Sequence, residues 1–231
     1  LGLADAHGAL DPGRVKVQVA HPSFFGDGGF GQVRLAGAFH PGECGTVDGM
    51  PSALTRALAP EPTRLTGLAP VAGPGARLLI LGSFPSVASL QAQQYYAHPR
   101  NQFWPILSAI WGLQGDQALN ALPYADRLPT VIDRGVAIWD VYAGCEREGS
   151  LDSAIREAQL NDLAGLLRGL PTLRGIAHNG GESARHMKLT RTLGLPVCQL
   201  PSTSPANASW SFERKLVAWR EAFERFGVAG P

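Results

Sequence analysis

Four short runs of branched apolar residues alternate with stretches of helical periodicity, and this order restricts the fold more than any other feature of the chain. The runs are too short for helices and have no polar alternation, which is typical of strands buried in a parallel sheet. They cover residues 78–81, 136–141, 175–178 and 197–200. The helical stretches cover residues 103–111, 163–170, 182–193 and 212–226, and Asn161-Asp162 is a candidate cap for the second of them. Because crossovers between parallel strands are right-handed, the pattern predicts a three-layer α/β/α sandwich around a short, mainly parallel four-stranded sheet.

Polar segments rich in glycine, serine and proline follow the four runs. In open α/β sheets the ligand binds outside the carboxyl ends of the strands, so these segments are expected to meet there. They are Gly82–Ser86, Asp140, Asn179–Gly181 and Leu200–Asn207. The last segment carries several hydroxyl groups, which can hydrogen-bond phosphate oxygens. The sequence therefore predicts a pocket at this edge of the sheet that holds a polyanion.

The first 76 residues differ from the rest of the chain in composition. They contain 14 glycines and 8 prolines, a proportion typical of low-complexity segments. We therefore place a boundary near Gly75, with a Gly/Pro-rich N-terminal extension of unknown role at residues 1–76 and the folded domain at residues 77–231. The extension is expected to be loosely ordered or docked, or to form a short β-rich element, since residues 15–19 alternate at the strand period.

One motif in the extension matches a kinase loop but is not interpreted as functional. Residues 26–33 match the Gly-x-Gly-x-x-Gly-x-Val loop of protein kinases. A kinase also requires a strand lysine soon afterwards, a His-Arg-Asp catalytic loop and an Asp-Phe-Gly motif, and the sequence contains none of these. A glycine-rich turn is the better interpretation.

Composition excludes several other classes. The net charge of +1 argues neither for nor against nucleic acid, because only the local distribution of basic residues matters for phosphate binding. No run approaches the ~20 apolar residues of a membrane span, and the first thirty residues do not have the order of a signal peptide, so a cytoplasmic location is expected. Neither metal nor other cofactor is expected, and the cysteines, which form no Cys-x-x-Cys pair, are expected to be reduced: Cys44, Cys145 and Cys198.

Three motifs together resemble a known enzyme family. The motifs read Gly82-Ser83-Phe84-Pro85-Ser86, Tyr95-Tyr96-Ala97-His98-Pro99-Arg100-Asn101-Gln102-Phe103-Trp104 and Leu200-Pro201-Ser202-Thr203-Ser204-Pro205. In this order and at these separations they resemble the uracil-DNA glycosylase superfamily. Two further segments, Trp139-Asp140-Val141 and Cys145–Asp152, make the chain most similar to the hypoxanthine-DNA glycosylase branch. The likeness extends from Arg77 to about Trp219 and leaves the extension unexplained.

The resemblance implies a DNA repair hydrolase that cuts the N-glycosidic bond of a damaged base and leaves an abasic site. Because a protein pocket cannot reach a base inside a duplex, the nucleotide has to swing out of the stack. Hypoxanthine is the first expected substrate and uracil the second, in single-stranded or double-stranded DNA, and the protein is expected to act as a monomer. The alternative is a DNA-binding module that captures damaged bases without cutting. Nucleotide hydrolysis is discounted, because a Gly-x-x-x-x-Gly-Lys-Ser loop is absent from the sequence.

The expected catalytic residues follow from the resemblance. Several branches place an Asp or Asn in the first motif to assist the attacking water, but here the residue is Phe84, which cannot hydrogen-bond. By resemblance, Asn101 positions the water instead, and the alternative is a helix cap before residues 102–111, which its position also fits. Ser83 and His98 complete the catalytic set, with His98 as a proton donor to a purine or as a structural residue.

The resemblance also predicts a set of base-binding residues. Tyr96 falls where the superfamily stacks a ring on the extruded base, with a core position as the alternative and Tyr95 as the fallback. Asp140 falls where relatives read the base edge; as a carboxylate it accepts an N–H, or it only accepts backbone bonds at a strand end. Asn179 either binds the base or begins the next helix. The full base-binding set is Phe84, Tyr96, Asp140, Asn179 and Ser202.

A third set of residues is expected to contact the DNA backbone. Thr203 and Ser204 resemble phosphate clamps, although turn chemistry alone would explain their segment. Ala206 falls where relatives carry the side chain that fills the hole left by the flipped base, and its small size implies a poor plug. Arg100, Arg214 and Lys215 lie near enough in the sequence to supply positive charge. The full DNA-binding set is Ser86, Arg100, Thr203, Ser204, Ala206, Asn207 and Lys215.

Overall fold

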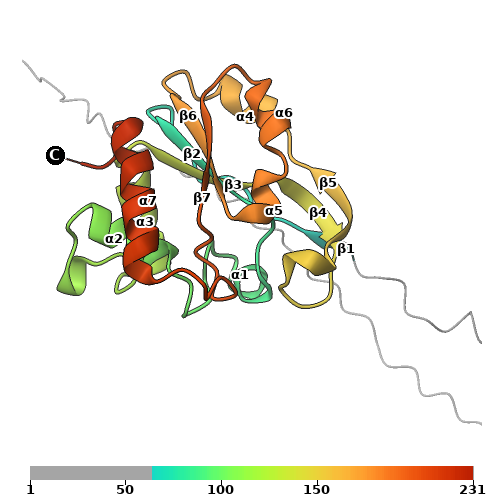
Figure 1. Cartoon of the computed structure of the whole chain (residues 1–231), viewed down its shortest axis with the longest axis horizontal. Helices are drawn as coiled ribbons and strands as arrows, with labels where there is room; N and C mark the ends of the chain where they lie inside the picture. Colours follow the sequence, from blue (N-terminus) through green and yellow to red (C-terminus); the bar gives the residue numbers. More distant parts are fainter. Residues whose placement is uncertain (1–63, 231) are drawn as a thin grey trace, which may run out of the picture. The chain divides into compact units, whose positions relative to one another are not determined.

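A four-stranded parallel sheet forms the middle layer of the domain in the computed structural model, which describes residues 64–230. Its strands lie in the order β3-β2-β6-β7 (Figure 1). All three neighbouring pairs are parallel. The bounds are β2 (Leu78–Gly82), β3 (Val136–Asp140), β6 (Gly175–Asn179) and β7 (Val197–Leu200). The four strands expected from the apolar runs are therefore confirmed.

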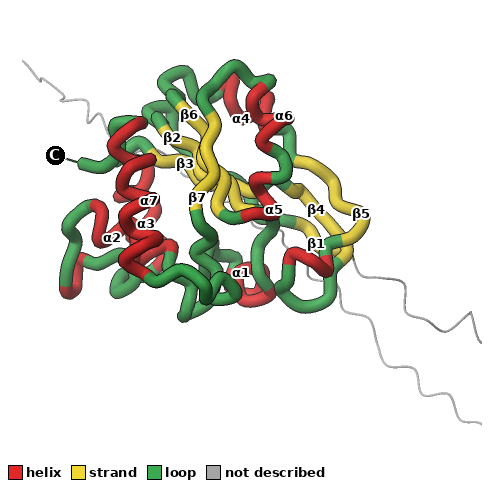
Figure 2. The backbone as a smooth tube through the Cα atoms, in the orientation of Figure 1, coloured by secondary structure: helices red, strands yellow, loops and turns green. Residues whose placement is uncertain are grey.

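Helices cover both faces of this sheet, which confirms the three-layer α/β/α architecture (Figures 1 and 2). One face packs against α2 (Phe103–Ile110), α3 (Tyr124–Asp133) and α7 (Phe212–Arg225). The other carries α4 (Leu163–Arg168), α5 (Gly181–Ala184) and α6 (Met187–Arg191). Because successive strand side chains point to opposite faces, Leu78 and Ile80 of β2 enter the first apolar core, and Leu79 and Leu81 enter the second.

The helix expected over residues 182–193 is broken into α5 and α6, and tertiary hydrogen bonds explain the break. The buried His178 ring on β6 contacts Ser183 of α5 through Nδ1 at 2.8 Å and Thr190 of α6 through Nε2 at 2.9 Å. Both short helices are thereby tied to one imidazole. The expected cap of α4 is confirmed, since the Asp162 carboxylate accepts a hydrogen bond from the backbone N–H of Gly165 at 2.7 Å.

A second, antiparallel sheet was not expected from the sequence. It has the order β1-β4-β5 and consists of β1 (Arg64–Thr66), β4 (Tyr142–Glu146) and β5 (Arg156–Leu160). Every residue of β5 is exposed, and its sequence, Arg-Glu-Ala-Gln-Leu, contains no apolar run from which a strand could be predicted. The remaining elements are α1 (Val87–Ala92) and two short 3-10 helices, η2 (Gly115–Gln117) and η3 (Asp152–Ala154).

The segment just before the expected boundary at residue 76 packs with the domain. Strand β1 pairs with β4, and Val71 forms an antiparallel bridge with Ile138 of β3. Residues 64–76 therefore belong structurally to the domain rather than to an extension. Residues 1–63 lie outside the described residues, and with them the expectations for residues 15–19, residues 26–33 and Cys44.

Two further expectations concern the described part of the chain. Cys145 and Cys198 are free thiols, as expected. Between residues 64 and 230 no helix has the length and the apolar character needed to cross a lipid bilayer.

Candidate functional site

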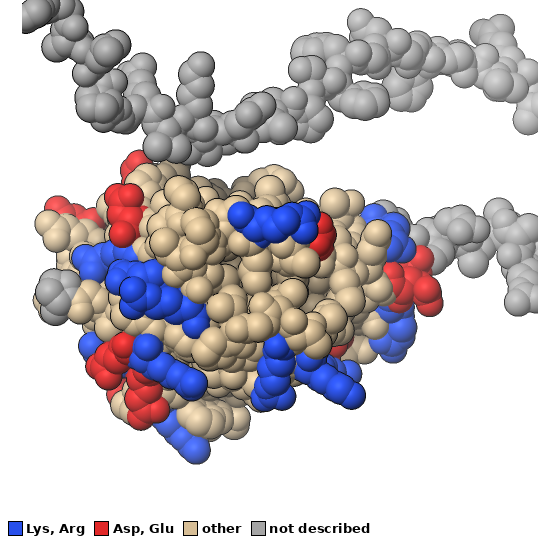
Figure 3. All heavy atoms as spheres, turned by 90° about the horizontal axis from the view of Figure 1, so that it is seen from above, with Lys and Arg blue, Asp and Glu red and all other residues tan. Residues whose placement is uncertain are grey.

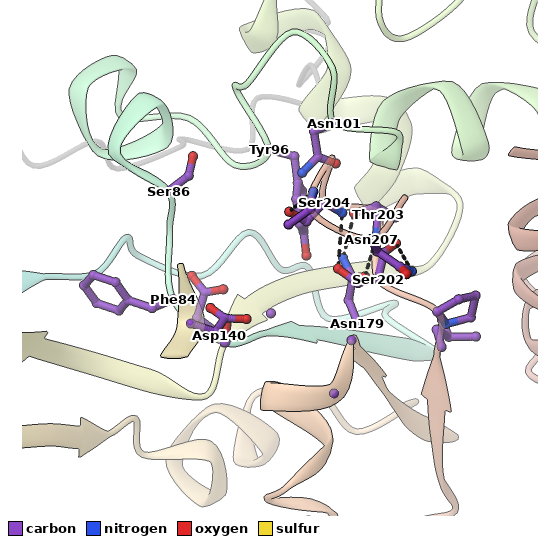
Figure 4. Close-up of a pocket in the computed structure, with 18 of the residues that line it drawn as sticks. Phe84, Ser86, Tyr96, Asn101, Asp140, Asn179, Ser202, Thr203, Ser204 and Asn207 are labelled. Atoms are coloured by element: carbon purple, nitrogen blue, oxygen red, sulfur yellow. Dashed lines mark hydrogen bonds between the residues drawn. The ribbon is translucent and has the colours of Figure 1, made fainter. Parts of the chain in front are cut away.

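A cavity of about 700 Å³ lies at the carboxyl ends of the parallel strands. Segments that follow all four strands line it, as the strand order predicted (Figure 4). The segment around Tyr96 and Asn101 and a loop at residues 150–152 complete the wall. Asn101 and Asp140, which are far apart in the chain, thus open into one cavity rather than two.

Asp140 is the buried carboxyl group of this cavity. It ends β3, directly beside Gly82 of β2, and is only 4% exposed. A methyl group at Gly82 would collide with Asp140 Oδ1, so a larger residue there would displace this carboxyl group. Oδ2 is buried without a hydrogen-bond partner among residues 64–230. The pKa of Asp140 is raised to about 7: burial is the largest cause, the like charge of Asp152 acts in the same direction, and Arg147 opposes both.

The Asn101 side chain hydrogen-bonds the backbone through its amide oxygen and also lines the cavity. Its Oδ1 accepts a hydrogen bond from the N–H of Phe103 at 3.0 Å, at the start of α2. Because a backbone N–H can only donate, this bond identifies the amide oxygen and leaves the NH₂ group to face elsewhere. Asn101 lines the cavity, and its Nδ2 has no hydrogen-bond partner in the described chain. Asn101 thus lies one residue before the N-cap of α2, which is Gln102, so it is not the cap residue itself. Its bond to Phe103 orients the amide and leaves a donor for a ligand.

The two neighbouring tyrosines have different environments. Tyr95 is 3% exposed and reaches the cavity wall, and its hydroxyl donates to the carbonyl oxygens of Leu68 and Ala69 at 3.2 and 3.1 Å, so its ring is held in the core. Tyr96 lines the cavity while its ring stacks on Phe103, with 3.8 Å between ring centroids and 17° between planes. One face of the Tyr96 ring is thus occupied by the protein. Stacking of a base on the Tyr96 ring stays a prediction.

Asn179 and Thr203 bind each other rather than pointing freely into the cavity. The Asn179 amide donates to the Thr203 hydroxyl and accepts from the Thr203 N–H, both at 3.0 Å (Figure 4). The carbonyl of Thr203 accepts from the N–H of Gln102 at 3.0 Å. Thr203 is fully buried, so the expectation that its hydroxyl clamps a phosphate is wrong. The pair instead joins the end of β6 to the loop after β7.

Lys215 was expected to contact DNA, and this expectation is also wrong. The residue is 1% exposed, and its ammonium group donates to Gln102 Oε1 at 2.8 Å and to the Asn207 carbonyl at 3.0 Å. Burial lowers the pKa of this group. Lys215 thus braces the loop after β7 against the start of α2. The neighbouring Arg214 lies over the ring of Trp210 at 3.8 Å.

The hydroxyl groups of the loop after β7 shape its turns. Ser202 Oγ accepts from the N–H of Ser204 at 3.2 Å, and Ser204 Oγ accepts from the N–H of Ala206 at 3.3 Å. Asn207 Nδ2 donates to the carbonyl of Ser202 at 3.0 Å. Turn chemistry is therefore present, as the alternative interpretation held. Both serines still have a hydroxyl hydrogen to donate, and these loop residues line the cavity.

The first motif contributes mainly through its backbone and its serines. Ser83 Oγ donates to Asp152 Oδ1 at 2.7 Å. Ser86 caps α1 by accepting from the N–H of Ser89 at 3.2 Å. The Phe84 ring is 6% exposed, packs in the second apolar core beneath the guanidinium of Arg147 and points away from the labelled side chains of the cavity (Figure 4). Phe84 nevertheless lies in the cavity wall, and contact between its ring and a base stays a prediction.

Besides Lys215, two predicted residues lie outside the cavity wall, His98 and Arg100. His98 Nδ1 accepts a hydrogen bond from the N–H of Arg100 at 3.1 Å within a turn, and neither residue lines the cavity. This geometry matches the structural interpretation of His98. Arg100 is exposed. The face of the molecule in Figure 3 shows acidic and basic side chains interspersed rather than a continuous basic patch.

Sequence reasoning missed part of the wall. Ser150, Leu151, Asp152 and Trp210 line the cavity. Residues 150–152 lie in a segment that contributed to the family resemblance, but no pattern in them indicated a role. Burial raises the pKa of Asp152, and the hydrogen bond from Ser83 opposes this change. Within residues 64–230, no three His, Cys, Asp or Glu residues cluster as a metal site.

Comparison with known proteins adds to this geometry. The sequence model of the family described as "Uracil DNA glycosylase superfamily" matches residues 70–224. The chain is 37% identical to a protein named hypoxanthine DNA glycosylase from Methanosarcina acetivorans, over 63% of this chain and 89% of the relative. It is 33% identical to a protein of the same name from Methanosarcina barkeri, over 69% of this chain and 98% of the relative.

One solved structure is also similar. It is a solution NMR structure from Methanosarcina acetivorans whose title describes a candidate uracil DNA glycosylase. The two chains are 34% identical and superpose with a TM-score of 0.63 over 71% of this chain and 99% of the other. At this level of identity the likeness includes the sequence as well as the fold.

Proposed function

The chain belongs to the uracil DNA glycosylase superfamily and is a DNA repair glycosylase for deaminated bases, and on this basis we propose that it releases hypoxanthine as its first substrate and uracil as its second. The names of the two Methanosarcina relatives support this order. The reaction is hydrolysis of the N-glycosidic bond of a nucleotide flipped out of the DNA, which leaves an abasic site.

The observation that supports this proposal most strongly is the single cavity shared by Asn101 and Asp140. Its volume of about 700 Å³ is in the range of small-molecule pockets and suffices for one extruded nucleotide. A carboxyl group that binds the base and an amide that binds water are both required near one glycosidic bond. Two separate cavities would have argued against the proposal.

We propose that Asp140 binds the ring N–H of the base. Hypoxanthine and uracil both carry a ring N–H beside a carbonyl, whereas adenine and cytosine have a ring nitrogen without hydrogen beside an amino group. A carboxyl oxygen accepts the N–H, and in the neutral form the acid also has a hydrogen to donate to the neighbouring carbonyl. Burial favours the neutral form of Asp140, because it raises the pKa of this group to about 7.

We propose that Asn101 holds the attacking water. Its Oδ1 is held by the N–H of Phe103 at 3.0 Å, which orients the amide and directs Nδ2 to a ligand. An amide cannot remove a proton from water at neutral pH, so its contribution is orientation while positive charge develops on the sugar. Ser202, which lines the cavity, offers a hydroxyl hydrogen to the departing base.

The proposal includes the setting in which the protein works. We propose that it acts as a monomer, without a cofactor, on single-stranded and double-stranded DNA in the cytoplasm. Light scattering at working concentration measures the oligomeric state directly.

The substitution Asn101→Ala tests the role of the amide. We expect DNA affinity and the fold to be retained while single-turnover release of hypoxanthine falls roughly 100-fold, because a mispositioned nucleophile costs about that much. The matched control is Asn120→Ala, an exposed asparagine outside the cavity wall. Oligonucleotides with hypoxanthine, uracil, xanthine or mismatched thymine establish the order of substrates.

Two outcomes would contradict the proposal. Unchanged release by Asn101→Ala would remove Asn101 from the mechanism. Tight binding of the modified oligonucleotides with no alkali-labile sites would instead identify a damaged-base-binding module.

A further inference from the structure

Leu151 is an exposed apolar side chain at the cavity. It is 62% exposed, more than any other large hydrophobic residue in the described chain, and it lines the cavity. Other exposed hydrophobic residues, such as Leu160 and Val217, do not line it. A scattered surface leucine is ordinary, but an exposed leucine beside a polar ligand cavity indicates a contact with a bound molecule.

The side chains of the two residues beside Leu151 tie its loop to the first motif and to α1. Ser150 Oγ accepts a hydrogen bond from the N–H of Val87 at 3.0 Å, at the start of α1. Asp152 Oδ1 accepts from Ser83 Oγ at 2.7 Å. Figure 1 shows the loop after β4 beside α1, in agreement with these contacts. Leu151 is therefore presented by a braced loop that is joined to the first motif.

We propose that Leu151 inserts into the DNA base stack and fills the space left by the nucleotide that enters the cavity. The inference rests on the proposed function, since it requires an extruded nucleotide. Apolar side chains that enter a base step replace part of the lost stacking contact and remove their own surface from water. The partner of this side chain is thus a duplex, and a single strand has no such gap to fill.

The other loop of the cavity offers no equivalent side chain. Ala206, expected from the resemblance to be the plug, has only a methyl group. Trp210 lines the cavity, but the Arg214 guanidinium lies over its ring at 3.8 Å. Among the described residues at the cavity, Leu151 is the exposed aliphatic side chain long enough to enter a base step.

The test compares one sequence as a duplex and as a single strand, each with hypoxanthine at one position. We expect Leu151→Ala to lower single-turnover release from the duplex roughly tenfold or more, from the loss of one buried aliphatic side chain. Release from the single strand should stay unchanged. Leu151→Met, which keeps the length and the apolar character, should retain most of the duplex activity.

Control variants and a second signal sharpen the result. Leu160→Ala and Val217→Ala remove exposed apolar side chains outside the cavity and should change neither substrate. A 2-aminopurine placed beside the hypoxanthine reports unstacking by its fluorescence. Wild-type protein should raise this fluorescence in the duplex, and Leu151→Ala should lower the rise.

Three results would overturn the inference. Equal losses on both substrates would show that Leu151 acts inside the cavity, and unchanged release from the duplex would show that it does not enter the stack. If the wild-type protein released no base even from the single strand, the proposed function itself would fail, and the inference with it.

Discussion

Two buried titratable side chains make the stability of the fold depend on pH, in opposite directions. Burial raises the pKa of Asp140 from 3.8 to about 7, so the folded state holds a proton that the unfolded state has released. Stability therefore falls as pH rises from about 4 to 7. Burial lowers the pKa of His178 from 6.5 to about 4, so the unfolded state binds a proton that the folded state does not. This residue therefore destabilises the fold as pH falls from 6.5 to about 4.

The substitution Asp140→Asn isolates the first effect. Asparagine keeps the shape of the side chain and removes its ionisation, while His178 is common to both proteins. Between pH 4.5 and pH 8 we expect the wild type to lose roughly 1 to 3 kcal/mol of unfolding free energy relative to Asp140→Asn. Urea denaturation across this range measures the difference. Parallel pH curves for the two proteins would show that Asp140 is not buried as a neutral acid.

At the scale of elements, buried polar contacts position the loop after β7. The Asn179–Thr203 pair joins this loop to the end of β6, with both hydrogen bonds at 3.0 Å. Lys215 of α7 joins the same loop to Gln102, at the start of α2. Buried polar groups that lose a partner are costly, so these contacts hold the loop in one arrangement. The wall of the cavity is therefore fixed before DNA arrives.

The substitution Lys215→Met separates this bracing role from phosphate binding. We expect unfolding free energy to fall by about 1 to 3 kcal/mol, because two part-buried acceptors lose their donor. The slope of log DNA affinity against log salt should stay as in the wild type, since Lys215 neutralises no phosphate. Lys188→Met, an exposed lysine of α6, is the matched control. A slope reduced by about one charge would show that Lys215 reaches the DNA backbone.

At the scale of the whole molecule, the segment at residues 64–71 completes the domain. Arg64–Thr66 pairs with β4, and Val71 bridges to Ile138. The Leu68 carbonyl accepts a hydrogen bond from Trp139 Nε1 at 3.1 Å. The Methanosarcina barkeri relative is matched over 98% of its length by 159 residues, so a glycosylase domain of this size occurs without a long additional segment.

Two deletions test where the domain begins. Removal of residues 1–63 should leave base release and Tm unchanged, because the paired segment is retained. Removal of residues 1–76 should lower Tm by about 4 °C or more, because it takes away β1 and the bridge of Val71. Calorimetry measures both. Equal Tm values for the two deletions would place the start of the domain at residue 77, as composition alone suggested.

The sequence by itself determined the layers and the location of the site. A buried parallel strand is a local pattern of branched apolar residues, and the carboxyl ends of parallel strands meet at one edge whatever the details of packing. This is why Gly82, Asp140, Asn179 and Ser202 could be assigned to a single cavity before any coordinates.

Only the tertiary structure decided which polar side chains face a ligand. Lys215 and Thr203 have the chemistry of phosphate contacts, but partners distant in the chain bury them: Gln102 is 113 residues from Lys215, and Asn179 is 24 residues from Thr203. Leu151 has no local signal at all, and the all-exposed β5 has none either. Exposure depends on what packs around a residue, and those neighbours come from elements whose approach no local pattern encodes.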